Sequence, residues 1–469
     1  MTPPPSSAAK AARTAAASGA ILSIGAALVG PVAPAGADVD NLAVANNADS
    51  GAGSLRQAIL DTNDGDAPGE VDTITIPAGL GPITLTTGEL TVDEPLVITG
   101  AGASAVTIAS DGSSRIFYLG TDGAVTISGV TLTGGSETDG GAIYSSGADL
   151  TIQSSVITGN DATDGGGGGL YASSGDFVRI VDTTFSGNTA TGRGGGAVVH
   201  LDDDELTVTG STFSGNTAGD YGGGLVSVHV YDVTIDRTTF SGNTAGDNGG
   251  GFHGHAHEYA ETSETPTSLT ISSSTFSGNT AAFYGGGVFA EYFSDVTIEH
   301  STIVGNDASD SGGGVFLYNV YDSATIDHTI IANNTGGDEA DLGVYVGDGV
   351  VADVSFSLIE SEPDASMIND AGGNIFGQDP MVGPLASNGG NTQTHALLAG
   401  SPAINTGDAA FAPPPATDQR GLARVQGGRI DIGAFEVQDP TPEPTPTTET
   451  PRTDPPAAQP VVATPTFTG

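Results

Sequence analysis

The sequence predicts an all-β fold, a single-stranded right-handed parallel β-helix (solenoid) with amino- and carboxy-terminal caps. Three observations support this prediction. A segment of 27 or 28 residues recurs through the middle of the chain, each copy contains short alternating apolar strands, and a run of glycines follows most copies. Self-similarity at a fixed period of this length is the signature of a stacked repeat. The copies align on the Asn of a Gly-Asn dipeptide, at Asn160, Asn188, Asn216, Asn243, Asn279 and Asn306.

Each copy contains three apolar strand positions. Alternation, as in Leu150-Thr151-Ile152, places aliphatic side chains on one face and Thr on the other. A second inward position is filled mainly by aromatic residues, at Phe185, Phe213, Phe240 and Phe276. A third is expected at Leu170, Val198, Leu225, Phe252, Val288 and Val315. Three short strands per repeat form one coil, and each strand pairs with its equivalent about 4.8 Å along the axis, over roughly ten to eleven coils.

The turns between these strands are expected to depend on Asn and Gly. Asn tolerates the left-handed backbone region, and its amide can bond the Asn of the next coil to form a ladder. The triple glycine suits a tight bend where backbones approach closely. The repetition is therefore interpreted as architecture rather than as a duplicated catalytic centre.

Composition divides the chain into five parts. Residues 1–37 carry basic, then apolar, then small residues, which predicts a secretory signal peptide. Residues 38–118 are expected to form an amino-terminal cap with the first irregular coils, and 119–337 the regular coils. Residues 338–437 are expected to be a carboxy-terminal capping domain that closes the other end. The Pro/Thr-rich residues 438–469 predict a disordered, extended tail.

Charge and composition limit the classes of partner. The chain has a formal net charge of −45, no Cys, and 56 Asp and Glu residues. Such a surface repels nucleic acid and anionic lipid and attracts cations, which suggests salt adaptation; no cofactor is assigned, and Ca²⁺ is the one candidate. No stretch beyond the signal peptide is long and apolar enough to span a membrane. We therefore expect a secreted, extracellular or cell-wall-associated monomer without a membrane span.

Several motifs resemble those of bacterial surface proteins. "FSGN" at Phe185, Phe213, Phe240 and Phe276, with "GGAI" at Gly140 and "GGAV" at Gly195, resembles the polymorphic membrane protein repeats of chlamydial proteins. "GSLRQAILDTN" (53–63) is similar to the CSLREA leader of bacterial β-helix surface proteins, although Gly53 replaces the Cys. "NGGNTQTHALLAGSPAINTGD" and "DQRGLARVQGGRIDIGAFE" are similar to a choice-of-anchor carboxy-terminal domain. The resemblance implies a right-handed β-helix that is secreted or at the cell surface, often with an adhesive role.

The clearest interruption of the repeat is a candidate metal site. The 36-residue interval between Asn243 and Asn279 contains "GFHGHAHEYAETSET". His-x-His pairs in an extended strand project to one side and can ligate Zn²⁺ or similar metals. The candidate ligands are His253, His255, His257 and Glu258, with His200, His229 and Glu291 expected nearby. The alternative interpretation is a solvated loop in a very acidic protein.

Catalytic candidates are fewer and weaker. A lyase acting on acidic polysaccharide needs carboxylates that hold Ca²⁺ and a base that removes the proton α to the uronate carboxylate. Arg179 and Arg237 are the candidate bases, and the candidate carboxylates are Asp202, Asp203 and Asp204. The alternative, which we favour, is that these Arg residues offset surface acid. In the carboxy-terminal block, ion pairs are expected among Asp418, Arg420, Arg424, Arg429, Asp431 and Glu436, and His395 is expected to be structural.

These observations favour an adhesin-like structural and binding protein whose exposed strand faces bind a glycan or a surface. The competing interpretation is an enzyme on the same fold, a Ca²⁺-dependent polysaccharide lyase of the pectate type or a glycoside hydrolase. With 9 Arg and no Lys after the signal peptide, binding a polyanionic substrate requires a bridging cation. The sequence leaves open the ligand, any catalytic activity and the anchoring of the tail.

Overall fold

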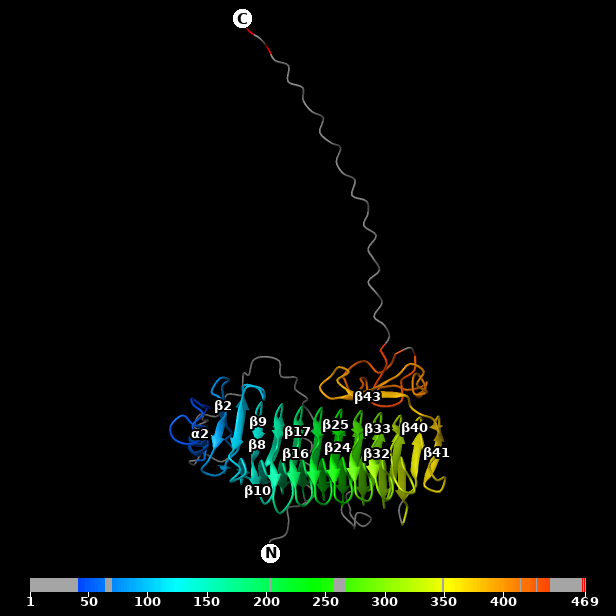
Figure 1. Ribbon diagram of the computed structural model, residues 1–469, viewed down its shortest axis with the longest axis horizontal. Helices are drawn as coiled ribbons and strands as arrows, with labels where there is room; N and C mark the ends of the chain where they lie inside the picture. Colours follow the sequence, from blue (N-terminus) through cyan, green and yellow to red (C-terminus); the bar gives the residue numbers. More distant parts are fainter. Residues whose placement is uncertain are drawn as a thin grey trace.

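The predicted fold is confirmed by the computed structural model, in which the chain winds as a right-handed parallel β-helix (Figure 1). The predicted signal peptide, residues 1–37, and nearly all of the Pro/Thr-rich tail lie outside the described residues. The structure describes residues 41–63, 70–201, 204–256, 266–347, 350–413, 415–426 and 428–438, together with Thr466 and Thr468.

Three main sheets run along the helix axis, and from β4 to β40 each coil contributes one strand to each of them in the order C, A, B. Sheet A consists of β1 (Asn41–Ala43), β2 (Asp72–Ile76), β5 (Leu96–Gly100), β8 (Ala124–Ser128), β12 (Asp149–Gln153), β16 (Phe177–Val181), β20 (Glu205–Thr209), β24 (Asp232–Asp236), β28 (Ser268–Ser272), β32 (Asp295–Glu299), β36 (Ser323–Asp327), β39 (Ala352–Ser355) and β41 (Ile368–Gly372). Sheet B consists of β3 (Ile83–Leu85), β6 (Thr107–Ser110), β9 (Thr131–Thr133), β13 (Val156–Thr158), β17 (Thr184–Ser186), β21 (Thr212–Ser214), β25 (Thr239–Ser241), β29 (Thr275–Ser277), β33 (Thr302–Val304), β37 (Ile330–Ala332), β40 (Leu358–Ile359) and β42 (Ile375–Phe376). Sheet C consists of β4 (Leu90–Val92), β7 (Phe117–Leu119), β11 (Ile143–Ser146), β15 (Leu170–Ser173), β19 (Ala197–His200), β23 (Leu225–Val228), β27 (Phe252–His255), β31 (Val288–Glu291), β35 (Val315–Tyr318) and β38 (Leu342–Tyr345).

A fourth, narrower sheet was not expected from the sequence. Sheet D lies between sheets B and C and contributes two residues per coil, a polar residue followed in most coils by Ala. The Ala side chain is buried and the polar one is more exposed, so even this short segment alternates. Sheet D consists of β10 (Ser136–Glu137), β14 (Asp161–Ala162), β18 (Thr189–Ala190), β22 (Thr217–Ala218), β26 (Thr244–Ala245), β30 (Thr280–Ala281) and β34 (Asp307–Ala308).

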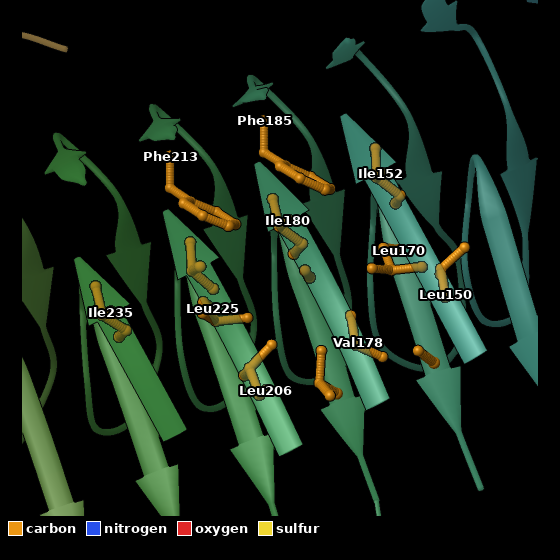
Figure 2. Packing of buried hydrophobic residues seen from close by; sticks show 14 of the residues in the cluster. Leu150, Ile152, Leu170, Val178, Ile180, Phe185, Leu206, Phe213, Leu225 and Ile235 are labelled. Carbon is orange, nitrogen blue, oxygen red and sulfur yellow. The ribbon is translucent and has the colours of Figure 1, made fainter. Parts of the chain in front are cut away.

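The core is a set of columns of equivalent side chains inside the coil (Figure 2). Leu150 and Ile152 of β12 lie in register with Val178 and Ile180 of β16, and all four are fully buried. Along sheet B the rings of Phe185 and the equivalent Phe of the next coil stack with centroids 4.9 Å apart. Burying one such side chain stabilises the fold by roughly 1.5–3 kcal/mol, so the columns supply a large share of the stability.

One predicted core position was wrong. Ala197, not Val198, pairs with Leu170 in sheet C, because Ala197 is the first residue of its strand, as Leu170 and Leu225 are in the neighbouring coils. Val198 therefore lies on the outer face, where it packs with Val226 and Val228 in a separate buried apolar cluster. A shift of one residue moves a side chain to the other face of a strand. The first inward residue directly follows the glycine run in each of these coils, and here that residue is the small Ala197, which the larger Val198 obscured in the sequence.

The Asn ladder runs through the turn between sheets B and D. The backbone N–H of Asn188 and its side-chain amide both donate to Oδ1 of Asn216, each over 3.0 Å. The amide also donates to the carbonyl of Ile157, at 2.9 Å, and Asn188 is fully buried. Asn334 is the last Asn of the series, and its backbone N–H and side-chain amide donate to Oδ1 of Asp341 instead of to another Asn. Each amide thus satisfies buried backbone groups of neighbouring coils.

The reason proposed for Asn in this turn needs correction. The left-handed backbone position belongs to the preceding glycine, for example Gly215 with φ of 60°, while the Asn provides hydrogen bonds. A second polar ladder occupies the turn between sheets A and B and was not recognised in the sequence. There the N–H of Thr183 donates to the Ser211 hydroxyl, and the N–H of Ser211 donates to the Thr238 hydroxyl.

The triple glycine is explained by close contact between coils. A Cβ on Gly223, the middle glycine of one run, would lie 2.5 Å from the carbonyl oxygen of Gly250 in the next coil. Its first glycine, Gly222, has φ of 63°, and a Cβ on the third, Gly224, would meet the carbonyl oxygen of Gly251 at 2.5 Å. These glycines allow sheets D and C to turn sharply while the coils stay at strand spacing.

The amino-terminal end is covered by helix α2 (Leu55–Thr62), seen at one end of the molecule in Figure 1. The Ser54 hydroxyl caps it by accepting from the N–H of Gln57, and Leu55, Ala58 and Ile59 are buried against the first coils. This helix lies in the leader-like "GSLRQAILDTN" segment. Its apolar spacing and Ser cap are readable in the sequence.

The carboxy-terminal block does not close the far end, contrary to expectation. Residues 338–376 include further coil strands, from β38 to β42. Residues 380–438, here called the lateral domain, contain the antiparallel pair β43 (Val382–Ala386) and β44 (Thr394–Leu397) and lie along the outer side of sheet B (Figure 1). Leu397, Ala403 and Ile432 pack there in a second core cluster, whose sheet B members are Val304, Ile330, Ala332 and Leu358.

The two kinds of glycine give a matched stability test. Gly223→Ala is expected to destabilise the protein by about 3 kcal/mol or more, because the added methyl group overlaps the backbone of the next coil. Gly215→Ala is expected to cost only about 1–2 kcal/mol, because its Cβ would meet no atom within 4 Å and only the left-handed backbone opposes it. Urea unfolding followed by circular dichroism measures both. Equal losses in the two variants would contradict the packing explanation.

Candidate functional site

The histidine segment singled out in the sequence lies on the outer face of sheet C. His253 and His255 are the second and fourth residues of β27, and inward-facing Phe252 and Gly254 alternate with them. His253 is 4% exposed, so it is buried although it lies outside the coil. His257 and Glu258, the other two predicted ligands, are outside the described residues.

Parallel register brings Glu291 of the next coil beside these histidines, since it pairs with His255. Its Oε1 lies 2.6 Å from His255 Nδ1 and 3.2 Å from His253 Nε2. Burial alone would raise the pKa of Glu291. The hydrogen bonds with His253 and His255 outweigh this effect and lower the pKa to about 2. The carboxylate is therefore charged at neutral pH and both rings point toward it.

Two more histidines extend this cluster along the sheet. His200 ends β19 and His229 follows β23, with ring centroids 5.2 Å apart, and His229 lies 5.7 Å from His255. These positions agree with the expectation that His200 and His229 lie nearby. The regular coil spacing, rather than any local motif, brings them together.

Acidic and phenolic groups border His253 on its other side. The ring of Tyr221 lies 5.0 Å from that of His253. Burial raises the pKa of Asp247, and although His253 opposes this, the charges of Asp220 and Glu291 add to the rise. Asp247 and burial in turn raise the pKa of Tyr221. The surroundings of His253 are therefore strongly electronegative and attract cations.

Aromatic rings continue from the histidines toward the last coils in two rows, here called the ring face. In one row Phe289 stacks on His253 with centroids 5.0 Å apart and on Phe316 at 5.8 Å. In the other, Tyr318 stacks on Tyr345 at 4.8 Å. The ring face consists of His253, His255, Tyr284, Phe289, Tyr292, Phe316, Tyr318 and Tyr345.

The ring face ends in a pocket of about 520 Å³. Tyr284, Phe316 and Tyr345 supply its rings, and Tyr345 is 51% exposed. Asp310, Asp338 and Glu339 line it with carboxylates. Glu339 is held in place by the Ser311 hydroxyl, which donates to it over 2.5 Å. The volume is in the range of ligand sites, and rings combined with a few acids give both apolar contact and hydrogen-bond acceptors.

The predicted catalytic residues are not brought to this pocket. Arg179 lies on sheet A, 3.9 Å from Glu205, with its guanidinium 3.8 Å from the Phe177 ring centroid. Arg237 pairs with Asp236 at 2.8 Å. The structure therefore places each Arg against an acidic neighbour, and β20 lies between β16, which contains Arg179, and β24, which Arg237 follows. Asp204 precedes β20, while Asp202 and Asp203 lie outside the described residues.

The carboxy-terminal charges form part of the lateral domain. Arg420 pairs with Asp418 at 2.6 Å, as an ion pair that holds the domain together. Arg424 is fully buried and donates to the carbonyl of Gly433, with the charges of Glu436, Asp418, Asp431 and Glu299 around it. Arg429 differs from the expectation, because it donates to the backbone carbonyls of Thr406 and Gly407 and forms no ion pair with an acid among the described residues.

Three histidines attach the lateral domain to the coils. His395 contacts the Gly383 carbonyl through Nδ1 and the Ser277 hydroxyl through Nε2, at 2.7 and 2.9 Å. His328 contacts Asp327 through Nδ1 and accepts from the N–H of Asp408 through Nε2. His300 stacks on His328 at 4.9 Å and meets Phe411 edge to face at 5.3 Å. Although His300, Asp327 and His328 are close enough to hold a metal, both nitrogens of His328 are already engaged by protein groups.

Comparison with known proteins agrees with this architecture. A family model described as a right handed beta helix region matches residues 114–284. The fold of the chain is that of a parallel β-helix. No curated protein and no solved structure matches it. The matched span covers the regular coils up to Tyr284 and includes both histidines of β27, and nothing in it distinguishes a binding protein from an enzyme. None of the helices in the described ranges has the length and apolar character needed to cross a bilayer.

The buried histidine at the lateral-domain interface gives a pH prediction. Burial, together with the charges of Arg424 and His328, lowers the pKa of His300 from 6.5 to about 2. Between pH 6.5 and about 2, His300 is therefore protonated in the unfolded chain but neutral in the folded chain. This part of the stability, which is present above pH 6.5, is accordingly lost as the pH falls toward 2. At pH 5 the loss from this residue is at most about 2 kcal/mol.

His300→Phe should remove this pH-dependent part, because Phe keeps the ring stacking and cannot take a proton. Phe356 already occupies the equivalent left-handed turn position, with φ of 43°, so the backbone tolerates Phe there. Urea midpoints of the two proteins at pH 7.5 and pH 5 measure the effect. If the two proteins differ in urea midpoint by the same amount at pH 7.5 and at pH 5, the pH-dependent loss of stability does not come from His300.

Proposed function

We propose that this β-helix protein is a secreted or cell-wall-associated binding protein for a polysaccharide, which it holds along the ring face and in the adjoining pocket. The observation that carries the proposal is the pocket of about 520 Å³ in which Tyr284, Phe316 and Tyr345 face carboxylates. Sugar rings have apolar C–H faces that pack on aromatic rings, and hydroxyl groups that donate to carboxylates.

The arrangement of the rings supports a long ligand over a small one. Equivalent positions in successive coils lie at strand spacing, so the rings of Tyr318 on β35 and Tyr345 on β38 lie one step apart along the axis. Tyr318 and Tyr345 stack on each other, whereas Phe289 and Phe316 in the adjoining row are only 3% and 8% exposed and offer a ligand little surface. A polymer of repeating units can contact several of these steps at once, which raises its affinity above that of one unit.

Charge supports a neutral or amino-substituted polysaccharide. The chain has a formal net charge of −45, and Asp310, Asp338 and Glu339 line the pocket itself. A polyuronate would meet like charge at every sugar, which disfavours binding unless cations bridge the two. The competing lyase interpretation requires a free basic residue near the substrate, and Arg179 and Arg237 are both placed against acids away from this pocket.

The test is binding of soluble polysaccharides to the purified chain by isothermal titration calorimetry. We expect binding of a neutral glucan or of chitosan oligomers, and weaker binding of polygalacturonate without Ca²⁺. Tyr345→Ala should weaken binding about tenfold, which corresponds to the loss of one ring contact of about 1.4 kcal/mol. The stability of the coil should change little, because Tyr345 is 51% exposed.

Leu422→Ala is the matched control, because Leu422 is 40% exposed but belongs to the lateral domain rather than the ring face. It should bind as the unchanged protein does. Release of unsaturated products from polygalacturonate in the presence of Ca²⁺, seen as ultraviolet absorbance, would contradict the proposal in favour of the lyase. Equal loss of binding in both variants would remove the ring face as the binding surface.

A further inference from the structure

Three metal-ligating side chains converge on the outer face of sheet C, at the end of the ring face. The ligand atoms of His253, His255 and Glu291 all lie within 4.8 Å of one another. Glu291 Oε1 is 3.2 Å from His253 Nε2 and 2.6 Å from His255 Nδ1. Donors bound to one Zn²⁺ at about 2.0–2.1 Å in tetrahedral geometry lie about 3.3 Å apart, so small side-chain shifts suffice to admit an ion.

Packing alone does not account for His253. The equivalent positions in the two neighbouring coils hold Val226 and Phe289, both nearly fully buried. An apolar residue would therefore fill this column without burying a polar group. His253 instead has a buried Nδ1 with no hydrogen-bond partner, although the residue is only 4% exposed. Burying such a nitrogen costs free energy that an apolar side chain would avoid, while the opposite ring nitrogen, Nε2, faces Glu291.

The donor set indicates the kind of ion. Two imidazole nitrogens and one carboxylate oxygen suit Zn²⁺ and other divalent transition metals, whereas Ca²⁺ prefers oxygen ligands only. The side chains of His255 and Glu291 remain 25% and 17% exposed, which leaves a route for an ion and for a further ligand. His253, by contrast, fixes the inner side of the site because the rings of Phe289 and Tyr221 enclose it.

We propose that His253, His255 and Glu291 bind one divalent transition-metal ion of the Zn²⁺ class. The ion exchanges the two hydrogen bonds to Glu291 for three coordination bonds that join β27 to β31. Coordination requires no chemical step beyond the displacement of water and of a proton from the coordinating imidazole nitrogens. The proposal does not depend on polysaccharide binding, although the ion would lie at the far end of the same ring face.

The experiment is calorimetric titration of the purified, chelator-treated full chain with ZnCl₂, in excess CaCl₂ so that surface carboxylates are occupied. We expect one Zn²⁺ per chain and a higher melting temperature with the metal. Co²⁺ should give the visible absorption of a tetrahedral nitrogen–oxygen site. His255→Asn and Glu291→Gln should each weaken Zn²⁺ binding at least tenfold.

The control is His229→Asn, because His229 lies in the same histidine cluster, 5.7 Å from His255 by ring centroid, but outside the converging set. It should bind Zn²⁺ within threefold of the unchanged protein. His253→Val, which copies the neighbouring coil, should lose Zn²⁺ binding while the metal-free protein keeps its melting temperature. The absence of saturable Zn²⁺ binding, or an equal loss in His229→Asn, would overturn the proposal.

Discussion

The rest of the molecule depends on coils that stack without a shift in register, and buried amides maintain that stacking. Oδ1 of Asn216 accepts both the backbone and the side-chain N–H of Asn188, and Asn216 repeats the arrangement with Asn243. A coil shifted by one residue would leave these donors unsatisfied in the interior and would turn every strand side chain to the wrong face. The hydroxyl ladder between sheets A and B imposes the same constraint at a second corner. Register then determines which functional side chains meet.

The sequence predicted the parts of the fold that repeat. Its period, its alternation and its columns of Phe and Asn are all found in the structure. Each of these patterns occurs in many copies of the repeat, so the sequence indicates it many times. Features that occur only once in the chain were harder to predict from the sequence. Val198 was misplaced because a single Ala before it begins the strand, and the lateral domain was expected at the end of the helix. One signal was available: outward residues of sheet B change from Thr and Ser to Val304 and Ile330 where the lateral domain covers them.

The candidate site shows the same limit. His253 and His255 were recognised because two alternating histidines are visible in one strand. The contact with Glu291 depends on register between coils 36 residues apart, so sequence spacing alone only placed it nearby. The pocket was not recognised, because its walls come from three coils and its rings look like ordinary strand residues. Conversely, Arg179 stood out in the sequence as an irregular residue, yet the structure places it on the Phe177 ring.

The lateral domain has an evolutionary consequence. It contacts Thr239, Thr275 and Thr302 in three consecutive coils, through Gln393, Gln419 and Ala434 respectively. The domain also reaches Asp182 through Asn391, so a duplication or deletion of one repeat before β16 would lengthen or shorten the solenoid and leave all these contacts in place. The same event between β25 and β33 would change the distance that the domain spans and break its interface. Length variation among descendants of this gene should therefore accumulate in the amino-terminal coils, while the number of coils under the lateral domain stays constant.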